Sequence, residues 1–152
     1  MRLAAYAAVF LSLVALAGCD GNGNGNGNGD AWSGPPEPAA DGSVSVGEFA
    51  EYRDGVDERW ERAAELTAAE FLRLDERTAV RTTIAGVGVG EGAGPRTVTV
   101  TFDGLLDDSV RAERWTLVFQ PEDEGYRLDS AVRTLRCHPG RGHDDFTPEP
   151  CV

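Results

Sequence analysis

Lysine is absent from the 152-residue chain, and all fourteen basic residues are arginines. Without a lysine amine the protein cannot form a Schiff base, use a Ser-Lys pair or place a phosphate-loop lysine on a nucleotide. The sequence also contains no G-x-S-x-G, no H-E-x-x-H and no G-x-G-x-x-G. We therefore predict no catalytic residues and no cofactor, and favour a role other than catalysis.

Positive charge is scarce throughout. Fourteen arginines face 26 acidic residues, which gives a net charge of −12. Nucleic acids and anionic lipid head groups both require positive patches on a protein that binds them. The charge balance therefore predicts no nucleic-acid partner, and no electrostatic attachment to a membrane.

No apolar run is long enough to span a membrane. The run from Leu3 to Leu16 follows Met1-Arg2 and has fourteen residues, with only Tyr6 and Ser12 as partial exceptions. As a helix it would measure about 21 Å, whereas the hydrocarbon layer is about 30 Å thick. A short apolar run that follows an arginine and ends in small residues is typical of an export signal.

The four residues after this run carry a resemblance. Leu16-Ala17-Gly18-Cys19 resembles the lipobox of bacterial lipoproteins, in which a Leu and two small residues precede a Cys. The resemblance implies that residues 1–18 are a signal peptide, that the Cys19 thiol carries a diacylglyceryl group, and that cleavage occurs just before Cys19. The expected location is the cell membrane, with a lipid anchor and the folded part on the extracytoplasmic side.

An ordinary signal peptide is the alternative, since Ala15-Leu16-Ala17 is also a small-x-small cleavage site. It would leave Cys19 as an unpaired thiol in a secreted chain with three cysteines. With Cys19 lipidated, Cys137 and Cys151 remain, and an oxidising location permits a disulfide between them. We predict this disulfide, which closes a C-terminal loop of about 15 residues.

A flexible tether is predicted for residues 19–43. Residues 21–29 read GNGNGNGNG, and a Pro-rich polar stretch follows. Such sequences lack an apolar pattern that could pack. Trp32 is the one aromatic residue of this arm, and we expect it to be a docking contact or an idle residue rather than part of the core. One folded domain over residues 44–152 is then expected.

A helix of about 28 residues is predicted at the start of this domain. Ser45 and Glu48 have the spacing of a capping box, flanked by Val44 and Phe49 as a hydrophobic staple. Apolar residues then recur every three or four positions, which favours one long helix interrupted only by Gly55. The stripe comprises Phe49, Tyr52, Val56, Trp60, Ala63, Leu66, Phe71 and Leu74.

Four strands are predicted after the helix, over residues 79–89, 97–102, 111–119 and 126–137. A shift of apolar parity between Ile84 and Val87 indicates a bulge near Gly86, and residues 91–95 have turn chemistry. Alternation predicts which strand residues face the core. They are Val98, Val100, Phe102, Trp115, Leu117, Phe119, Leu128 and Val132.

The predicted fold is α+β: one long N-terminal helix packed on a curved four-stranded antiparallel sheet, with a disulfide-closed C-terminal loop. This element order over residues 45–137 resembles the cystatin-like and ketosteroid-isomerase-like group, in which a curved sheet wraps a long helix. The sequence departs from the isomerase type, which has additional helices. A likeness of fold implies little about function.

The C-terminal loop holds both histidines. His138, His143 and Asp144 are candidate metal ligands, because imidazole and carboxylate suit divalent ions. Their spacing matches no known metal motif, so we predict local hydrogen bonding in the loop and no metal.

Three hypotheses about function follow. The first is an exported lipoprotein whose domain is an interaction or binding module, with an envelope protein as its partner. The second is a small-ligand carrier or cone-type enzyme with a pocket between helix and sheet, where Tyr52, Tyr126 and Glu113 supply the polar groups. The third is a structural component of the cell envelope.

Overall fold

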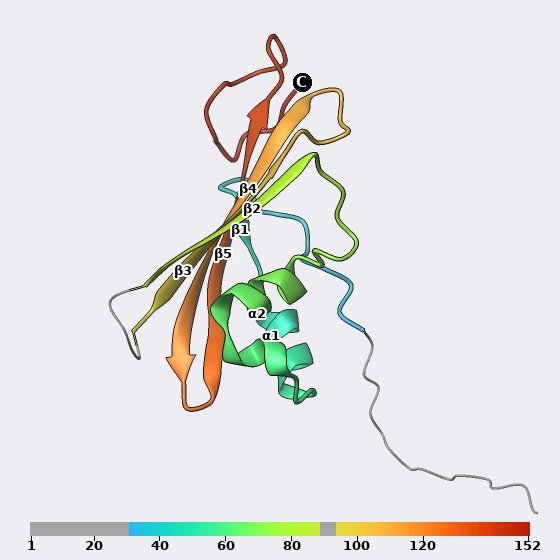
Figure 1. Cartoon of the computed structure of the whole chain (residues 1–152). Helices are drawn as coiled ribbons and strands as arrows, with labels where there is room; N and C mark the ends of the chain where they lie inside the picture. Colours follow the sequence, from blue (N-terminus) through green and yellow to red (C-terminus); the bar gives the residue numbers. More distant parts are fainter. Residues whose placement is uncertain (1–30, 89–93) are drawn as a thin grey trace, which may run out of the picture.

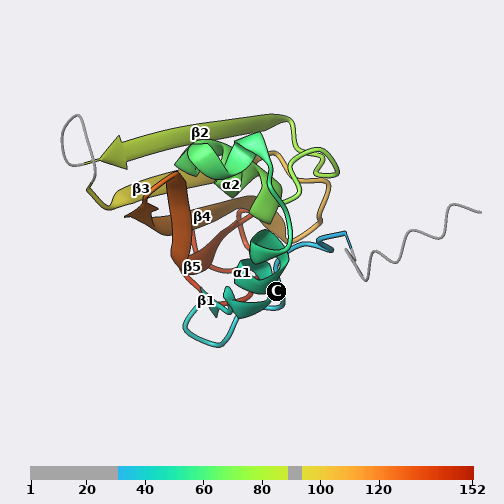
Figure 2. The same ribbon diagram turned by 90° about the horizontal axis from the view of Figure 1, so that it is seen from below.

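The computed structural model describes residues 31–88 and 94–152. In these ranges the chain forms a twisted antiparallel sheet with short helices on one of its faces (Figures 1 and 2). The predicted signal peptide, lipobox and Cys19 lie outside the described residues, as does most of the predicted turn at 91–95. The described part contains no helix with the length and apolarity that a membrane crossing requires.

The predicted long helix is wrong. The segment instead forms helix α1 (Gly47–Asp54), the 3₁₀ turn η1 (Arg59–Arg62) and helix α2 (Ala64–Phe71). Gly55 ends α1, and Ala63 has an extended backbone with φ −135° and ψ 125°, which separates η1 from α2. The two breaks, at Gly55 and Ala63, fold the segment back on itself, so α1 and α2 both contribute buried residues to the core.

The predicted helix start is also displaced. Helix α1 begins with Val46 as its N-cap and has no side-chain cap, so Ser45 and Glu48 form no capping box. The capping box belongs to η1, where the Glu58 and Glu61 side chains each accept from the other's backbone N–H. Val44 and Phe49 are both buried, as the staple predicts.

The sheet has five strands in the described residues, one more than predicted. They are β1 (Ser43–Val44), β2 (Arg81–Gly88), β3 (Arg96–Asp103), β4 (Val110–Glu122) and β5 (Gly125–Cys137), in the spatial order β1-β5-β4-β3-β2. Every neighbouring pair is antiparallel. The additional strand β1 has only two residues, too few for an alternating pattern to reveal.

The inward residues of β3 and β4 are confirmed, because all six predicted side chains are buried. Two details of register differ from prediction. Strand β2 pairs with β3 in an unbroken register, so the predicted bulge at Gly86 is wrong. All eight residues of β2 are exposed, and the alternation of its apolar residues therefore does not indicate a buried face. In β5 a bulge at Asp129 changes the parity, so that Ala131 rather than Val132 faces the core after Leu128.

The core lies between the sheet and the helices. Its largest fully buried side chains are Trp115, Phe49, Phe71, Phe102 and Phe119. Helix α2 supplies Ala64, Thr67, Ala68 and Phe71, which recur at the spacing of one helical face, and its C-cap residue Leu72 is buried beside them. This face differs from the predicted stripe, and Leu66 is left exposed.

Candidate functional site

Trp32 is part of the core, so the expectation that it lies outside is wrong. Its side chain is 5% exposed, and its ring stacks on Phe71 and Tyr52 and meets Phe49 edge to face. The indole N–H donates to the Phe71 carbonyl at 2.7 Å, and Arg73 donates to the Trp32 carbonyl. Because Phe71 ends α2, the indole satisfies one of the carbonyls that a helix C-terminus leaves free.

Glu113 is a buried carboxylate between two arginines. One oxygen accepts from Arg77 at 2.8 Å and from the Trp115 indole, and the other accepts from Arg133 at 2.9 Å. The segment with Pro35, Pro36 and Pro38 lies beside this group and forms the other wall of a hollow of about 170 Å³. The two guanidinium groups compensate the charge of the buried carboxylate, which would be costly to bury without them.

The three polar residues of the pocket hypothesis are not brought into one cavity. Tyr52 donates to Glu70 at 3.0 Å, and burial together with this bond raises the pKa of Tyr52. Tyr126 packs against the edge of the core, and Glu113 is held by its arginines. Among three hollows in the described ranges, Glu113 lines one, and Tyr52 and Tyr126 line none of the three.

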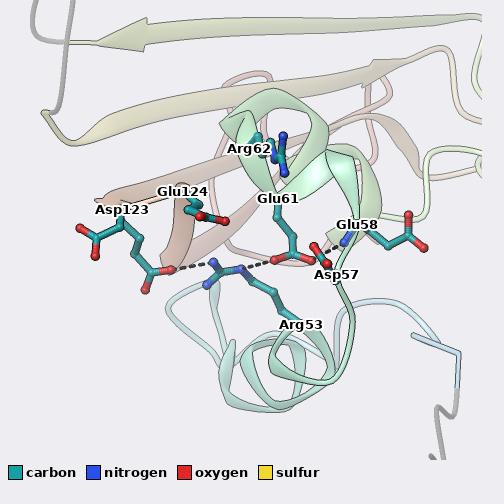
Figure 3. A pocket seen from close by; sticks show the side chains of 8 residues that line it. Arg53, Asp57, Glu58, Glu61, Arg62, Asp123 and Glu124 are labelled. Atoms are coloured by element: carbon teal, nitrogen blue, oxygen red, sulfur yellow. Dashed lines mark hydrogen bonds and ion pairs between the residues drawn. The ribbon is translucent and has the colours of Figure 1, made fainter.

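The largest of these hollows lies at the surface, where the turn between β4 and β5 meets the loop after α1 (Figure 3). It measures about 580 Å³. Arg53 crosses it and binds Glu122 at 2.6 Å and Glu61 at 3.7 Å. The other lining residues are Asp57, Glu58, Arg62, Asp123 and Glu124. The sequence pattern does not indicate this site, because the Arg53–Glu122 pair joins residues 69 positions apart.

The predicted disulfide is confirmed. Cys137 and Cys151 are bonded, with their Cα atoms 5.5 Å apart. The loop they close folds back over the outer face of the sheet, where the Phe146 ring lies 3.7 Å from the guanidinium carbon of Arg114. Thr147 forms a β-bridge with Leu135. The loop is therefore held by backbone bonds and an aromatic contact as well as by the covalent link.

The candidate metal ligands of this loop are not brought together. In the described residues, His143 groups with Cys137 and Cys151, whose sulfurs are already joined to each other. Both His143 ring nitrogens contact carbonyls, that of Asp145 at 2.8 Å and that of Glu149 at 2.9 Å. A carbonyl only accepts, so both bonds require the protonated ring. The bonds to Glu149 and Asp145 accordingly raise the pKa of His143.

Strand β2 is the most exposed ordered element. All eight residues are exposed, and β2 is the outermost strand of the described sheet, so one row of its backbone N–H and C=O groups has no strand partner there (Figure 2). Exposed apolar side chains lie along β2, directly before it and on helix α2. They are Ile84 (44% exposed), Val87 (71%), Val80 (84%) and Leu66 (51%). An open edge with apolar side chains is a surface on which another strand can pair.

Comparisons of the chain with protein-family models, with curated proteins and with solved structures found no match.

Proposed function

We propose that the protein is an exported lipoprotein, anchored by a lipid on Cys19, whose domain acts as an interaction module on the extracytoplasmic side of the membrane. The observation that carries the interaction role is the open edge of β2, with its unpaired backbone groups and exposed apolar residues. The sequence around Cys19 and the oxidised Cys137–Cys151 pair support the location.

The anchor and the domain have a defined maximum separation. Trp32 is fixed in the core, and Cys19 lies 13 residues before it. A fully extended chain of 13 residues spans at most about 45 Å. The lipid would therefore keep the helix side of the domain within about one domain diameter of the membrane.

The experiment that tests the anchor compares the full chain with Cys19→Ser in bacterial cells. We expect the wild-type protein in the membrane fraction, with an N-terminal peptide whose mass includes acyl chains beginning at Cys19. Cys19→Ser should lose the acyl mass and the N-terminus at position 19, because the lipobox resemblance implies that lipidation and cleavage both require the Cys19 thiol. Ser12→Ala is the matched control and should behave like wild type. An unmodified Cys19 peptide in washed membranes would refute the lipid anchor.

The interaction role is tested by pairing at β2. Thr83→Pro removes one backbone donor in the middle of the strand, whereas Thr83→Val keeps the backbone and the β-branched shape. A complex in native membranes that survives Thr83→Val and is lost with Thr83→Pro would support the role. A complex that persists with both substitutions would place the contact on a surface other than the β2 edge.

A further inference from the structure

The two edges of the described sheet differ in how well they are protected. Strand β1 offers two residues at its edge, and β2 offers eight. Natural sheets protect an edge with proline, inward charge, a bulge or a very short strand. Strand β1 is protected by its shortness. Strand β2 has no proline and no bulge, and its single charge, Arg81, is at its first residue.

The inner and outer faces of β2 can be assigned from its register. Ile84 lies opposite Val100 of β3, which is buried, so Ile84 points to the helix side of the sheet. Gly86 lies on the same face against α2, where an added Cβ would come within 2.1 Å of Glu65 Oε1. Arg96 binds Glu65 at 2.7 Å. The Glu65 carboxylate beside this part of the edge is therefore already paired.

We propose that a second copy of the chain pairs with this edge, the two β2 strands running antiparallel across a twofold axis at Ile84. In this register Ile84 faces its symmetry mate, Thr83 faces Ala85, Thr82 faces Gly86 and Arg81 faces Val87. The apolar Ile84 pair continues the two cores across the interface. The inference rests on the proposed function and names the partner of the same surface.

The charges along β2 do not oppose this register. The chain as a whole is acidic, so two copies repel each other at long range. Along β2, however, the one charged residue of each copy faces an apolar residue, and the two Arg81 side chains are about 20 Å apart, at six strand residues of spacing. No like charges face each other directly within the paired strands.

Symmetry gives a second reason. Pairing β2 with β2 uses the long open edge of both copies and leaves the two short β1 strands as outer edges, so the assembly closes as a dimer. The twofold axis is perpendicular to the sheet, which keeps both helix layers on one side. Trp32 docks on that side in each copy, so both N-terminal segments would leave toward the same membrane.

The experiment is a cysteine scan of β2 in the full-length, membrane-anchored chain, with copper-phenanthroline as the oxidant. Single substitutions are made at Arg81, Thr83, Ile84, Ala85 and Val87; Gly86 is omitted because a side chain would collide with Glu65. We expect covalent dimer to be maximal for Ile84→Cys and lost for Arg81→Cys or Val87→Cys alone, since a disulfide requires Cα atoms within about 7 Å.

The matched control mixes Arg81→Cys chains with Val87→Cys chains in the same cells. These positions face each other in the proposed register, so the mixture should regain the crosslinked dimer that neither variant forms alone. Mass spectrometry of the same samples reports the acylated Cys19 peptide and the intact Cys137–Cys151 pair. The proposed anchor and the proposed dimer can therefore fail separately.

Three outcomes would overturn the dimer. A crosslinking profile that is flat along β2 would mean random collision between anchored copies. An absence of crosslinked dimer at all positions would mean that the edge is not paired with itself. Crosslinking of Ile84→Cys to a different protein would assign the edge to another partner.

Discussion

Trp32 shows how one side chain decides where the domain begins. The residue stands in a sequence rich in glycine, asparagine and proline, yet it is 5% exposed and in contact with three aromatic rings. Its indole N–H also completes the end of α2. Local composition predicts a loose arm here, and the long-range aromatic contacts override it.

Replacing Trp32 should therefore destabilise the whole domain. We expect Trp32→Ala to lower the free energy of unfolding by about 3–5 kcal/mol, the usual cost of emptying a large aromatic site. Trp32→Phe should recover most of this loss, and the part it does not recover reflects the missing hydrogen bond, about 1 kcal/mol. Urea denaturation followed by circular dichroism measures both. A change below about 0.5 kcal/mol for Trp32→Ala, the range of neutral surface substitutions, would contradict the buried position.

His143 is the residue whose protonation the structure links to the C-terminal loop. Its ring bonds to the Glu149 and Asp145 carbonyls raise its pKa in the folded state, and the nearby Glu149 and Asp144 carboxylates act in the same direction. In the unfolded chain the pKa is about 6.5. The stabilisation is therefore complete below pH 6.5 and is lost as the pH rises through the folded-state pKa.

The raised pKa of His143 can be tested directly. NMR titration of the His143 ring should show a pKa above the ordinary value, and the amides of residues 143–149 should exchange faster as the pH passes it. His143→Gln keeps a polar side chain without titration, so its loop should show no such step. A ring that titrates at or below pH 6.5 would refute the two-carbonyl arrangement.

The C-terminal loop combines a disulfide with contacts to the sheet. Cys137 and Cys151 are 14 positions apart. Closing a loop of this length stabilises a protein by about 3 kcal/mol in the chain-entropy model. The bridge of Thr147 to Leu135 and the Phe146 contact should keep part of the loop in place even without the bond.

We therefore expect Cys137→Ala/Cys151→Ala to lower the free energy of unfolding by about 3 kcal/mol while leaving the sheet intact. Thermal unfolding reports the first quantity, and hydrogen exchange of β3 and β4 reports the second. Phe146→Ala in the oxidised protein is the comparison that removes the aromatic contact alone. Loss of protection in β3 and β4 would mean that the loop is required for folding.

The strands of the sheet are predicted from the sequence more accurately than the helices. Alternation predicts the inward faces of β3 and β4 correctly, because each strand has one buried and one open face. The apolar spacing predicts a single helix because it continues across both breaks. Gly55 was visible in the sequence, but the extended Ala63 follows from packing onto the sheet, and alanine itself favours helix.

For the whole molecule, net charge and the open edge act against each other. The chain carries −12, and the repulsion between two copies is screened by salt, with a Debye length of about 10 Å at 0.1 M and about 3 Å at 1 M. Pairing through β2 depends on backbone bonds and apolar contacts, which salt does not weaken in this way. Salt should therefore favour the dimer.

This predicts the salt dependence of the Ile84→Cys crosslink. In purified lipid vesicles carrying the full-length protein, the crosslinked fraction should rise as sodium chloride is increased from about 0.05 M to about 0.5 M, because screening shortens the range of the repulsion. Arg81→Cys on its own gives the background from collision. A crosslinked fraction that falls with salt would indicate an interface held by ion pairs, which the residues of β2 do not supply.

The sequence alone determined properties that depend on local chemistry and on counting. The acidic charge, the missing lysine chemistry, the α+β class, the inward faces of β3 and β4 and the pairing of Cys137 with Cys151 all follow from residue type, spacing and number. The export signal and the lipid on Cys19 are predictions of the same kind.

Tertiary structure decided what depends on contacts between distant residues. Trp32 is buried because α1 and α2 together form its site, and Glu113 is neutralised by arginines 36 and 20 positions away. The exposure of β2 is decided the same way, because the order of the described sheet leaves this strand at the edge. Local propensity cannot report such positions, because the free energy that sets them comes from burial against other elements.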